Sequence, residues 1–132
     1  MSLVVLDASV GVKWFRDEAG TVEARRLLTD HGAGSIAIVV PSLFVYEVVG
    51  VASRSMSEQR LDEFWRRFVS WGLHVRQLDD ELVRASLELR IELGCAYYDS
   101  VSPALARLLG APLYSADRRA HTQMENVVLL GG

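Results

Sequence analysis

The sequence predicts an α/β fold in which a mostly parallel central sheet of about five strands lies between two layers of helices. First, short apolar runs such as residues 3–6 and 36–40 have the length of fully buried strands. Second, these runs alternate with longer segments of helical periodicity, which is typical of a parallel sheet covered on both faces. Third, 132 residues with 50% hydrophobic content suit one domain, predicted here over residues 1–132.

The predicted strands are short and end at residues that stop a strand or begin a turn. Asp7 closes the first strand, and Pro41 stops the second because proline restricts the backbone of the residue before it. The predicted strands cover residues 3–7, 36–40, 74–78, 112–115 and 127–130.

The predicted helices fill the segments between the strands. Thr21, Ser42 and Ser57 are expected at helix starts, and Gly72 and Gly94 at helix ends. The predicted helices cover residues 9–15, 21–28, 42–49, 57–71, 79–93 and 102–109, with a brief helix after Asp117 and a loop over residues 31–35. The sixth helix is expected to begin at Ser102-Pro103, because proline is favoured at the first helical position.

Four acids stand at places where ligands gather in α/β proteins. Asp7 and Asp117 follow predicted strands and Asp99 lies just before a predicted helix, so all three are expected at the carboxyl edge of the sheet. Glu47 lies inside an apolar helical run and needs a cation, a hydrogen-bond donor or solvent. Each acid also has a purely structural explanation, because the aspartates can cap helices and Glu47 can face solvent.

A cluster of carboxylates favours a hard divalent cation. Like charges raise one another's pKa, and a bound cation relieves that repulsion. Oxygen ligands suit Mg²⁺ or Mn²⁺ better than Zn²⁺. His31, His74 and His121 show no ligand spacing and are predicted to be surface or loop residues, and Cys95 is predicted to be packed.

Composition excludes several classes of protein. The net charge of −3 gives no global basic signal for nucleic acid, although setting four acids aside for a metal leaves the remaining charges nearly balanced. Neither a P-loop nor a GxGxxG motif is present. A single cysteine, no secretory signal and no apolar stretch of about 20 residues predict a cytoplasmic protein without a membrane segment.

Four short motifs in order resemble those of the PIN domain family, particularly the VapC-type toxin ribonucleases of toxin–antitoxin pairs. The motifs are Leu6-Asp7-Ala8-Ser9, Pro41-Ser42-Leu43-Phe44-Val45-Tyr46-Glu47, Ala96-Tyr97-Tyr98-Asp99-Ser100 and Leu113-Tyr114-Ser115-Ala116-Asp117-Arg118-Arg119. The chain departs from the family at Ser100, Ser102 and Pro103, where the family often has a small residue followed by an aromatic one. Ser115 stands where threonine is more frequent.

The resemblance implies a PIN-like α/β/α sandwich and a Mg²⁺- or Mn²⁺-dependent endoribonuclease, the toxin of a pair. Asp7 and Asp99 would be the primary metal ligands, Glu47 a ligand or water-orienting group, and Asp117 a further ligand. These four acids would be the catalytic residues. Ser9 and Ser115 would hold carboxylates or waters by hydrogen bonds.

The resemblance also implies partners. RNA phosphates would meet basic residues near the sheet edge, for which the candidates are Lys13, Arg16, Arg118 and Arg119. A cognate antitoxin and a second copy of the chain would use apolar surface. The candidates are Trp14-Phe15 and an apolar helical stripe that is more naturally core, formed by Leu61, Phe64, Trp65, Phe68 and Trp71.

Two other functions compete with the nuclease. A phosphatase of the haloacid dehalogenase type wants a second aspartate where Ser9 stands and a late lysine, but Lys13 is the only lysine. A non-catalytic PIN-like or receiver-like protein-binding module would keep the acidic pocket without cleaving RNA. Intact acids without metal-dependent cleavage would identify such a module.

Overall fold

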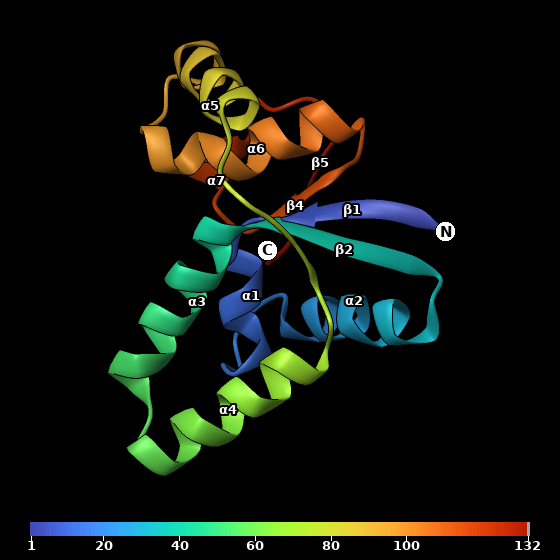
Figure 1. Cartoon of the computed structure of the whole chain (residues 1–132), viewed down its shortest axis with the longest axis vertical. Helices are drawn as coiled ribbons and strands as arrows, with labels where there is room; N and C mark the ends of the chain where they lie inside the picture. The colour runs from blue at the N-terminus through green and yellow to red at the C-terminus, as the bar shows by residue number, and fades with distance from the viewer. Residues whose placement is uncertain (132) are drawn as a thin grey trace.

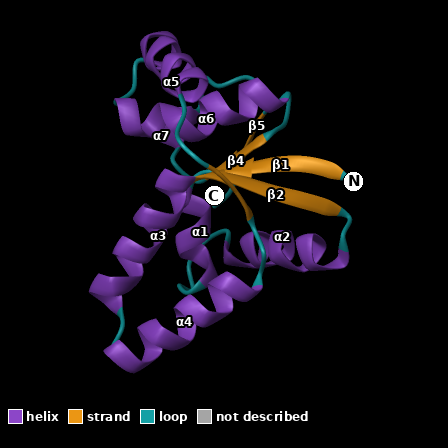
Figure 2. Ribbon diagram, in the orientation of Figure 1, coloured by secondary structure: helices purple, strands orange, loops and turns teal. Residues whose placement is uncertain are grey.

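The computed structural model describes residues 1–131 and has one fully parallel five-stranded sheet at its centre (Figures 1 and 2). The strands are β1 (Ser2–Leu6), β2 (Ile36–Pro41), β3 (His74–Arg76), β4 (Leu113–Ser115) and β5 (Val127–Leu129). Their order in the sheet is β3-β2-β1-β4-β5. The chain winds outward in both directions from β1, so the order reverses between β1 and β4, where α/β folds bind ligands.

Helices cover both faces of this sheet, as predicted. They are α1 (Ala8–Gly11), α2 (Thr21–Ala33), α3 (Ser42–Ser55), α4 (Glu58–Ser70), α5 (Asp80–Leu93), α6 (Tyr97–Leu109) and α7 (Arg118–His121), with a 3-10 turn η1 (Val12–Trp14) after α1. Figure 1 shows α5 and α6 on one side of the sheet and α1, α2 and α4 on the other. No helix within residues 1–131 is both long and apolar enough to cross a membrane.

The protein has two hydrophobic cores, one on each face of the sheet, and side chains along β1 point alternately into them. Val4 and Leu6 join the core under α1 to α4, whereas Val5 joins the core under α5 and α6. All three are buried, which explains why the strand reads as a continuous apolar run. This burial fixes the end of β1 between the two layers, and the residue that follows is Asp7.

A close contact between α1 and α3 sets the position of Glu47. A Cβ added at Gly11 would lie 2.7 Å from both Phe44 Cζ and Val48 Cγ2. Real Cβ atoms do not approach that closely, so glycine at this position allows the two helices to touch. Phe44 and Val48 flank Glu47 on α3, and their burial directs this segment of α3 toward the end of β1.

The aromatic stripe of α4 packs mostly inward. Phe64 and Phe68 are buried, and Trp71 makes an edge contact with Trp14 at 5.2 Å between ring centroids. Trp65 is 42% exposed. The stripe is therefore mainly core, with one indole left on the surface.

Three predicted helix boundaries are wrong. α3 continues beyond its predicted end at Val49 to Ser55. α6 begins at Tyr97, with Ala96 as its N-cap, and Pro103 lies inside the helix instead of at its start. α2 continues to Ala33, across most of the segment predicted as a loop, and Gly34 ends it with φ of 82°. Local propensity misplaced these boundaries because packing against the sheet outweighs the weak preferences of single residues.

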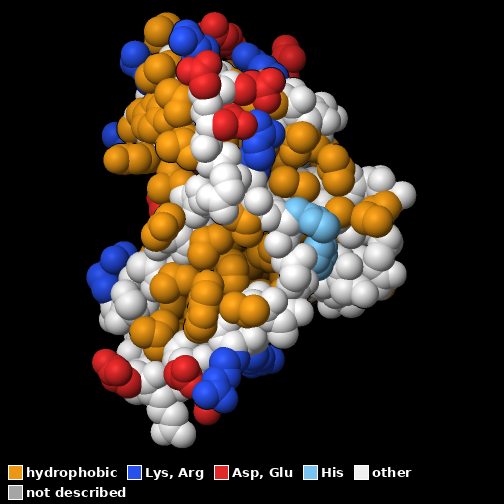
Figure 3. Space-filling view, in the orientation of Figure 1, with side chains coloured by type: hydrophobic (Ala, Val, Ile, Leu, Met, Phe, Trp, Pro, Cys, Tyr) orange, Lys and Arg blue, Asp and Glu red, His pale blue; other side chains and the backbone are white. Residues whose placement is uncertain are grey.

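The surface carries exposed apolar side chains around α3. In Figure 3 hydrophobic side chains gather over the space between α3 and α4. A groove of about 360 Å³ lies there, lined by Val45, Tyr46, Val49, Gly50, Ser53 and Trp65. Tyr46 is 77% exposed, which is unusual for so large an apolar side chain.

Candidate metal-dependent active site

Asp7 follows β1 and caps α1. Its Oδ2 accepts hydrogen bonds from the Ser9 amide at 3.0 Å and from Ser9 Oγ at 2.6 Å. Ser9 Oγ in turn accepts a hydrogen bond from the amide of Ala116 at 2.9 Å, although Ala116 lies at the far end of the sequence. The Ser9 hydroxyl therefore joins the end of β1 to the segment after β4.

Asp117 occupies the corresponding place after β4. Its amide donates to Oγ of the buried Ser115 at 3.0 Å, and its Oδ1 accepts the amide of Ala120 at 3.1 Å as the cap of α7. The bonds to Asp7 fall on Oδ2 and the cap bond to Asp117 falls on Oδ1. Each carboxylate therefore keeps a second oxygen for a ligand, and capping does not compete with a role in the site.

Asp99 lies in the first turn of α6, where a negative charge interacts favourably with the helix dipole. The next residue, Ser100, is fully buried, and its hydroxyl donates to the carbonyls of Ser86 at 2.9 Å and Tyr97 at 2.6 Å. Ser86 belongs to α5. This contact anchors the start of α6 against α5 and fixes the backbone that carries Asp99.

The structure brings all four predicted acids to one pocket. A cavity of about 270 Å³ is lined by Asp7, Ala8, Ser9, Val12, Arg16, Glu47, Val51, Asp99 and Asp117. Asp99 and Asp117 also line a neighbouring cavity of about 400 Å³ with Cys95 and Arg119. Glu47 reaches the pocket from α3 and remains accessible to solvent. The four acids therefore come from four separate parts of the chain: the end of β1, α3, the start of α6 and the segment after β4.

The acids perturb one another. Partial burial of the carboxylate, followed by the charges of Asp7 and Asp99, raises the pKa of Glu47 to about 7. Burial, followed by the charges of Asp117 and Asp7, raises the pKa of Asp99. Burial also raises the pKa of the Cys95 thiol, and the charge of Asp99 adds to that effect. Two carboxyls with raised pKa in one cleft indicate a functional site.

The carboxylate oxygens of the pocket are ligands that suit a hard divalent ion. The distances between the acids limit how many of them could bind one ion. Within residues 1–131 no group of three or more histidine, cysteine, aspartate or glutamate side chains is arranged to hold a metal ion by itself. Mg²⁺ is usually bound by one or two carboxylates and keeps several waters or substrate phosphate oxygens. The carboxylate oxygens of the pocket fit such partial coordination, but not a closed protein cage.

Two of the four predicted basic residues lie at the site. Arg16 lines the pocket of the four acids and Arg119 lines the neighbouring cavity. Lys13 is instead 6% exposed, and its ammonium donates to Glu18 at 3.0 Å and to the Ala19 carbonyl at 2.6 Å. Arg118 donates to the carbonyl of Gly131 at 2.7 Å.

The predicted placement of two histidines is wrong. His121 is completely buried, and it bonds Ser115 Oγ at 2.7 Å and the Asp99 carbonyl at 2.6 Å. His31 lies in α2, not in a loop, and accepts the Ile38 amide on Nδ1 at 3.1 Å. His74 is exposed on β3. No sequence signal pointed to His121: Pro103 inside α6 deprives the Asp99 carbonyl of its usual donor, but the spacing does not show which residue replaces it.

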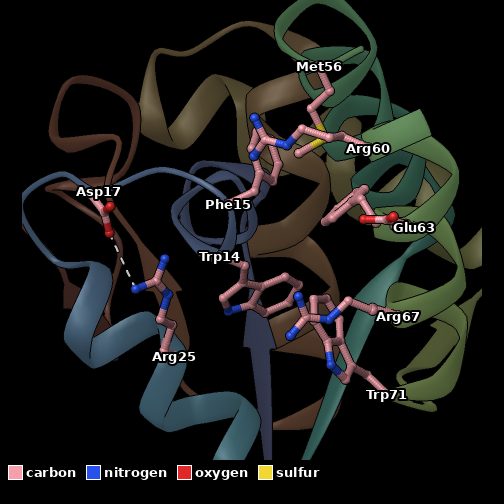
Figure 4. A pocket seen from close by; sticks show the side chains of 10 residues that line it. Trp14, Phe15, Asp17, Arg25, Met56, Arg60, Glu63, Arg67 and Trp71 are labelled. Carbon is pink, nitrogen blue, oxygen red and sulfur yellow. Dashed lines mark ion pairs between the residues drawn. The ribbon is translucent and has the colours of Figure 1, made fainter. Parts of the chain in front are cut away.

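A second pocket of about 330 Å³ lies away from the acids, between η1, α2 and α4. Figure 4 shows Trp14 at its centre, with Arg25 on one side and Arg67 and Trp71 on the other. Its lining is Trp14, Phe15, Asp17, Arg25, Met56, Arg60, Glu63, Phe64, Arg67 and Trp71. Asp17 and Arg25 pair across one edge at 3.4 Å. The pocket thus combines aromatic walls with an excess of positive charge.

Comparison with known proteins identifies relatives of this fold. The family model described as PIN domain matches residues 4–125. No curated protein matches the chain. A toxin–antitoxin complex from Klebsiella pneumoniae aligns with a TM-score of 0.73 and 20% identity, covering 95% of each chain.

Two further solved structures share the fold. DNA-bound VapBC from Salmonella typhimurium aligns with a TM-score of 0.74 and 16% identity over 98% of this chain and 97% of that one. VapC20 of Mycobacterium tuberculosis, described as a sarcin–ricin loop cleaving toxin, aligns with a TM-score of 0.65 and 16% identity over 85% of this chain and 86% of that one.

Proposed function

This chain belongs to the PIN domain family, and we propose that it is a Mg²⁺- or Mn²⁺-dependent endoribonuclease, the toxin of a toxin–antitoxin pair. The observation that carries the proposal is the pocket in which Asp7, Glu47, Asp99 and Asp117 meet. The similarity in fold to toxins of VapBC pairs supports it, as does a similar toxin described as cleaving the sarcin–ricin loop.

Asp7 and Asp99 would hold the divalent ion directly, with Asp117 as a further ligand through a bound water. When bound, the ion would activate water, orient the phosphate and stabilise charge on the leaving oxygen. Ser9 keeps Asp7 in place through two hydrogen bonds on one oxygen, and Ser115 orients the amide of Asp117. The Ser9 hydroxyl would thus hold the carboxylate of Asp7, and the Ser115 hydroxyl would hold the backbone of Asp117.

Glu47 would orient the attacking water and take up its proton. Without metal the pKa of this carboxyl is raised to about 7, so its carboxylate is a better proton acceptor than that of an ordinary glutamate. Arg16 and Arg119 would contact RNA phosphates at the rim of the site. The substrate is expected to be a single-stranded segment or loop, because duplex RNA hides its base edges.

Replacing Asp7 with Asn tests the nuclease. Asn keeps the shape and can still accept the cap hydrogen bonds, but it removes a charge from the site. We expect Mg²⁺-dependent RNA cleavage to fall by more than the about 10–100-fold that loss of a residue supporting a ligand produces. Cleavage would be followed on single-stranded RNA, with EDTA as the metal-free reference.

Asp62→Asn is the matched control. Asp62 lies on the exposed side of α4 and pairs only with Arg66, so this variant should cleave as the unmodified protein does. Equal cleavage by Asp7→Asn and Asp62→Asn would contradict the assignment of Asp7.

A non-catalytic binding module remains the alternative function. The observation that favours it is the lack of a ready three-residue metal cage within residues 1–131. Such a module would bind a protein partner with all four acids intact and would show no cleavage that depends on Mg²⁺ or Mn²⁺. The assay above therefore separates the two functions.

The antitoxin would dock in the aromatic pocket of Figure 4. Arg25, Arg60 and Arg67 outnumber the acids Asp17 and Glu63 in its lining, which favours a segment that carries both apolar and acidic side chains. Phe15 and Trp71 are partly exposed and would supply the aromatic contacts, with the buried Trp14 and Phe64 behind them. A buried aromatic centre with an arginine rim is typical of energetically important contacts.

Reversing one rim charge tests this surface. Arg67→Glu should weaken binding of the antitoxin encoded with this protein, measured by isothermal titration calorimetry, because it repels an acidic segment. Arg84→Glu, on the exposed face of α5, is the control. Equal affinity of the two variants would remove the aromatic pocket from the interface.

A homodimer would use the exposed apolar side chains around α3. Tyr46 lines both the groove beside Trp65 and a pocket of about 200 Å³ shared with Leu78 and Tyr98. These side chains are 77%, 62% and 65% exposed for Tyr46, Leu78 and Tyr98, and contiguous apolar surface of this kind marks interaction sites. Light scattering that shows only monomer at high concentration would contradict the dimer.

A further inference from the structure

His121 connects two of the acidic motifs through a fully buried ring. Its Nε2 lies 2.6 Å from the carbonyl oxygen of Asp99 in α6, and its Nδ1 lies 2.7 Å from Ser115 Oγ at the end of β4. None of its surface is exposed to solvent. A histidine in this position contacts neither the pocket nor bulk water, so any effect on the site must pass through the backbone.

The Asp99 carbonyl is available because of Pro103. In an α-helix this carbonyl would accept the amide hydrogen of the residue four positions later, and that residue is Pro103, which has no amide hydrogen. His121 supplies the missing donor from another element. The proline inside α6 and the buried histidine in α7 are thus two parts of one arrangement.

The hydrogen bonds determine which nitrogen carries the proton. A carbonyl oxygen only accepts, so Nε2 of His121 must donate to Asp99. Ser115 Oγ already accepts the amide of Asp117 at 3.0 Å, which leaves its hydroxyl hydrogen free to be donated to Nδ1. A neutral imidazole protonated on Nε2 therefore satisfies every group, and no buried side-chain polar atom within residues 1–131 lacks a partner.

The result is a continuous network behind the pocket. Asp99 connects to His121 and Ser115, and Ser115 connects to the amide of Asp117. The neighbouring amide of Ala116 connects through Ser9 to Asp7. Three of the four acids are thereby fixed relative to one another by hydrogen bonds that do not use the free carboxylate oxygens.

We propose that His121, paired with Pro103, is a positioning residue that orients the backbone of Asp99 toward Asp7 and Asp117 and so sets the affinity of the site for the divalent cation. This inference rests on the proposed function, because it presumes that the pocket binds Mg²⁺ or Mn²⁺. A buried polar network that is fully satisfied gives one well-defined geometry, which a metal site with few protein ligands requires.

Mn²⁺ titration without RNA, followed by electron paramagnetic resonance, tests the proposal. His121→Phe keeps an aromatic ring in the core and removes both hydrogen bonds, and we expect it to lower Mn²⁺ affinity by about 10–100-fold. His121→Gln keeps a terminal amide that can donate to Asp99 and should retain more of the affinity. Thermal unfolding of each variant is recorded in EDTA, so that stability and metal affinity are measured separately.

Pro103→Ala provides the decisive control because it restores the helix amide. In the His121→Phe background this amide can donate to the Asp99 carbonyl, so the double variant should recover most of the lost Mn²⁺ affinity. Pro103→Ala alone should bind Mn²⁺ nearly as the unmodified protein does. A histidine that only fills the core would give no such recovery. Two-bond proton–nitrogen NMR should also show the His121 hydrogen on Nε2.

The outcomes separate this inference from the proposed function. If the unmodified protein binds Mn²⁺ and His121→Phe binds it equally well, the positioning role is wrong and the proposed function stands. If the unmodified protein binds no Mn²⁺, the proposed function is wrong and the inference fails with it. If His121→Phe does not fold, His121→Leu removes both hydrogen bonds with a smaller side chain, and unchanged Mn²⁺ affinity in that variant overturns the proposal.

Discussion

The pocket has two sides that are built by different forces. On one side, Asp7, Asp99 and Asp117 are joined through hydroxyls, amides and an imidazole in a hydrogen-bond network. On the other side, Glu47 reaches the pocket on α3, whose position depends on apolar packing of Phe44 and Val48 against α1. Hydrogen bonds are directional, whereas packing specifies shape and distance.

This difference matches the tasks proposed for the acids. A metal ligand needs a fixed direction for its lone pairs, and the networked side provides it. A group that orients water and exchanges a proton needs a tuned pKa, and Glu47 obtains one from partial burial beside two charges. The comparison predicts that damage to the two sides will have different consequences.

Among variants that keep all four acids, the largest loss of activity is expected on the networked side, from Ser9→Ala. This variant removes the bond to Asp7 and the bridge to the Ala116 amide. Metal-dependent RNA cleavage should fall by about 10–100-fold, as expected for loss of a group that holds a ligand. Ser70→Ala, on the exposed end of α4, is the control. Full activity of Ser9→Ala would show that the bridge is dispensable.

On the packed side, Gly11→Ala is expected to lower stability, with a smaller effect on metal-dependent cleavage. The new methyl group would collide with Phe44 and Val48, which are buried and cannot move away. We expect a loss of about 1–3 kcal/mol in the free energy of unfolding, measured with urea. Gly32→Ala in α2 has nothing within 4 Å and should instead stabilise by about 0.5–1 kcal/mol. Equal stability of the two variants would contradict close α1–α3 packing.

The smallest effect is expected from the pH dependence of stability in the metal-free protein. Folding raises the pKa of Glu47 from 4.5 to about 7, so the folded state binds the proton more tightly than the unfolded chain. Stability from this group is therefore present at low pH and is lost as pH rises through that window. In EDTA, the unfolding temperature of Glu47→Gln should fall less than that of the unmodified protein between about pH 5 and about pH 8.

Glu88→Gln, on the exposed surface of α5, is the control for that measurement. Added Mg²⁺ should reduce the difference between Glu47→Gln and the unmodified protein, because the ion relieves the repulsion. Identical pH profiles of the two glutamine variants would show that the raised pKa of Glu47 does not affect stability.

Much of the fold could be predicted because strong signals agreed. Buried apolar runs located β1 and β2, a weaker alternating segment located β3, and Ser57 and Asp79 lie at helix starts as predicted. Lys13 was a candidate for RNA, yet its ammonium is bonded inside the protein, because its sequence neighbours Glu18 and Ala19 fold back over it. Sequence propensity depends on the type of a residue and its neighbours along the chain. It does not show which group will lie beside that residue in the folded protein.

Pro103 and His121 show this most clearly. A proline after serine is typical of a helix start, but packing of α6 against α5 extends the helix back to Tyr97. Because Pro103 therefore lies inside the helix, the Asp99 carbonyl has no amide donor within α6. His121, 22 residues later, donates to it instead. Sequence spacing gave no sign of that contact.

The sequence by itself determined the alternation of strands and helices, the parallel sheet and the three aspartates at its carboxyl edge, because burial periodicity and strand ends are local properties. Only the tertiary structure decided which groups hold those acids. The Ser9 bridge, the fit of Gly11 against α3 and the pairing of His121 with Asp99 each join residues distant in sequence. Such contacts exist only after the chain has closed around its two cores, because hydrogen bonds and close packing act over a few ångströms.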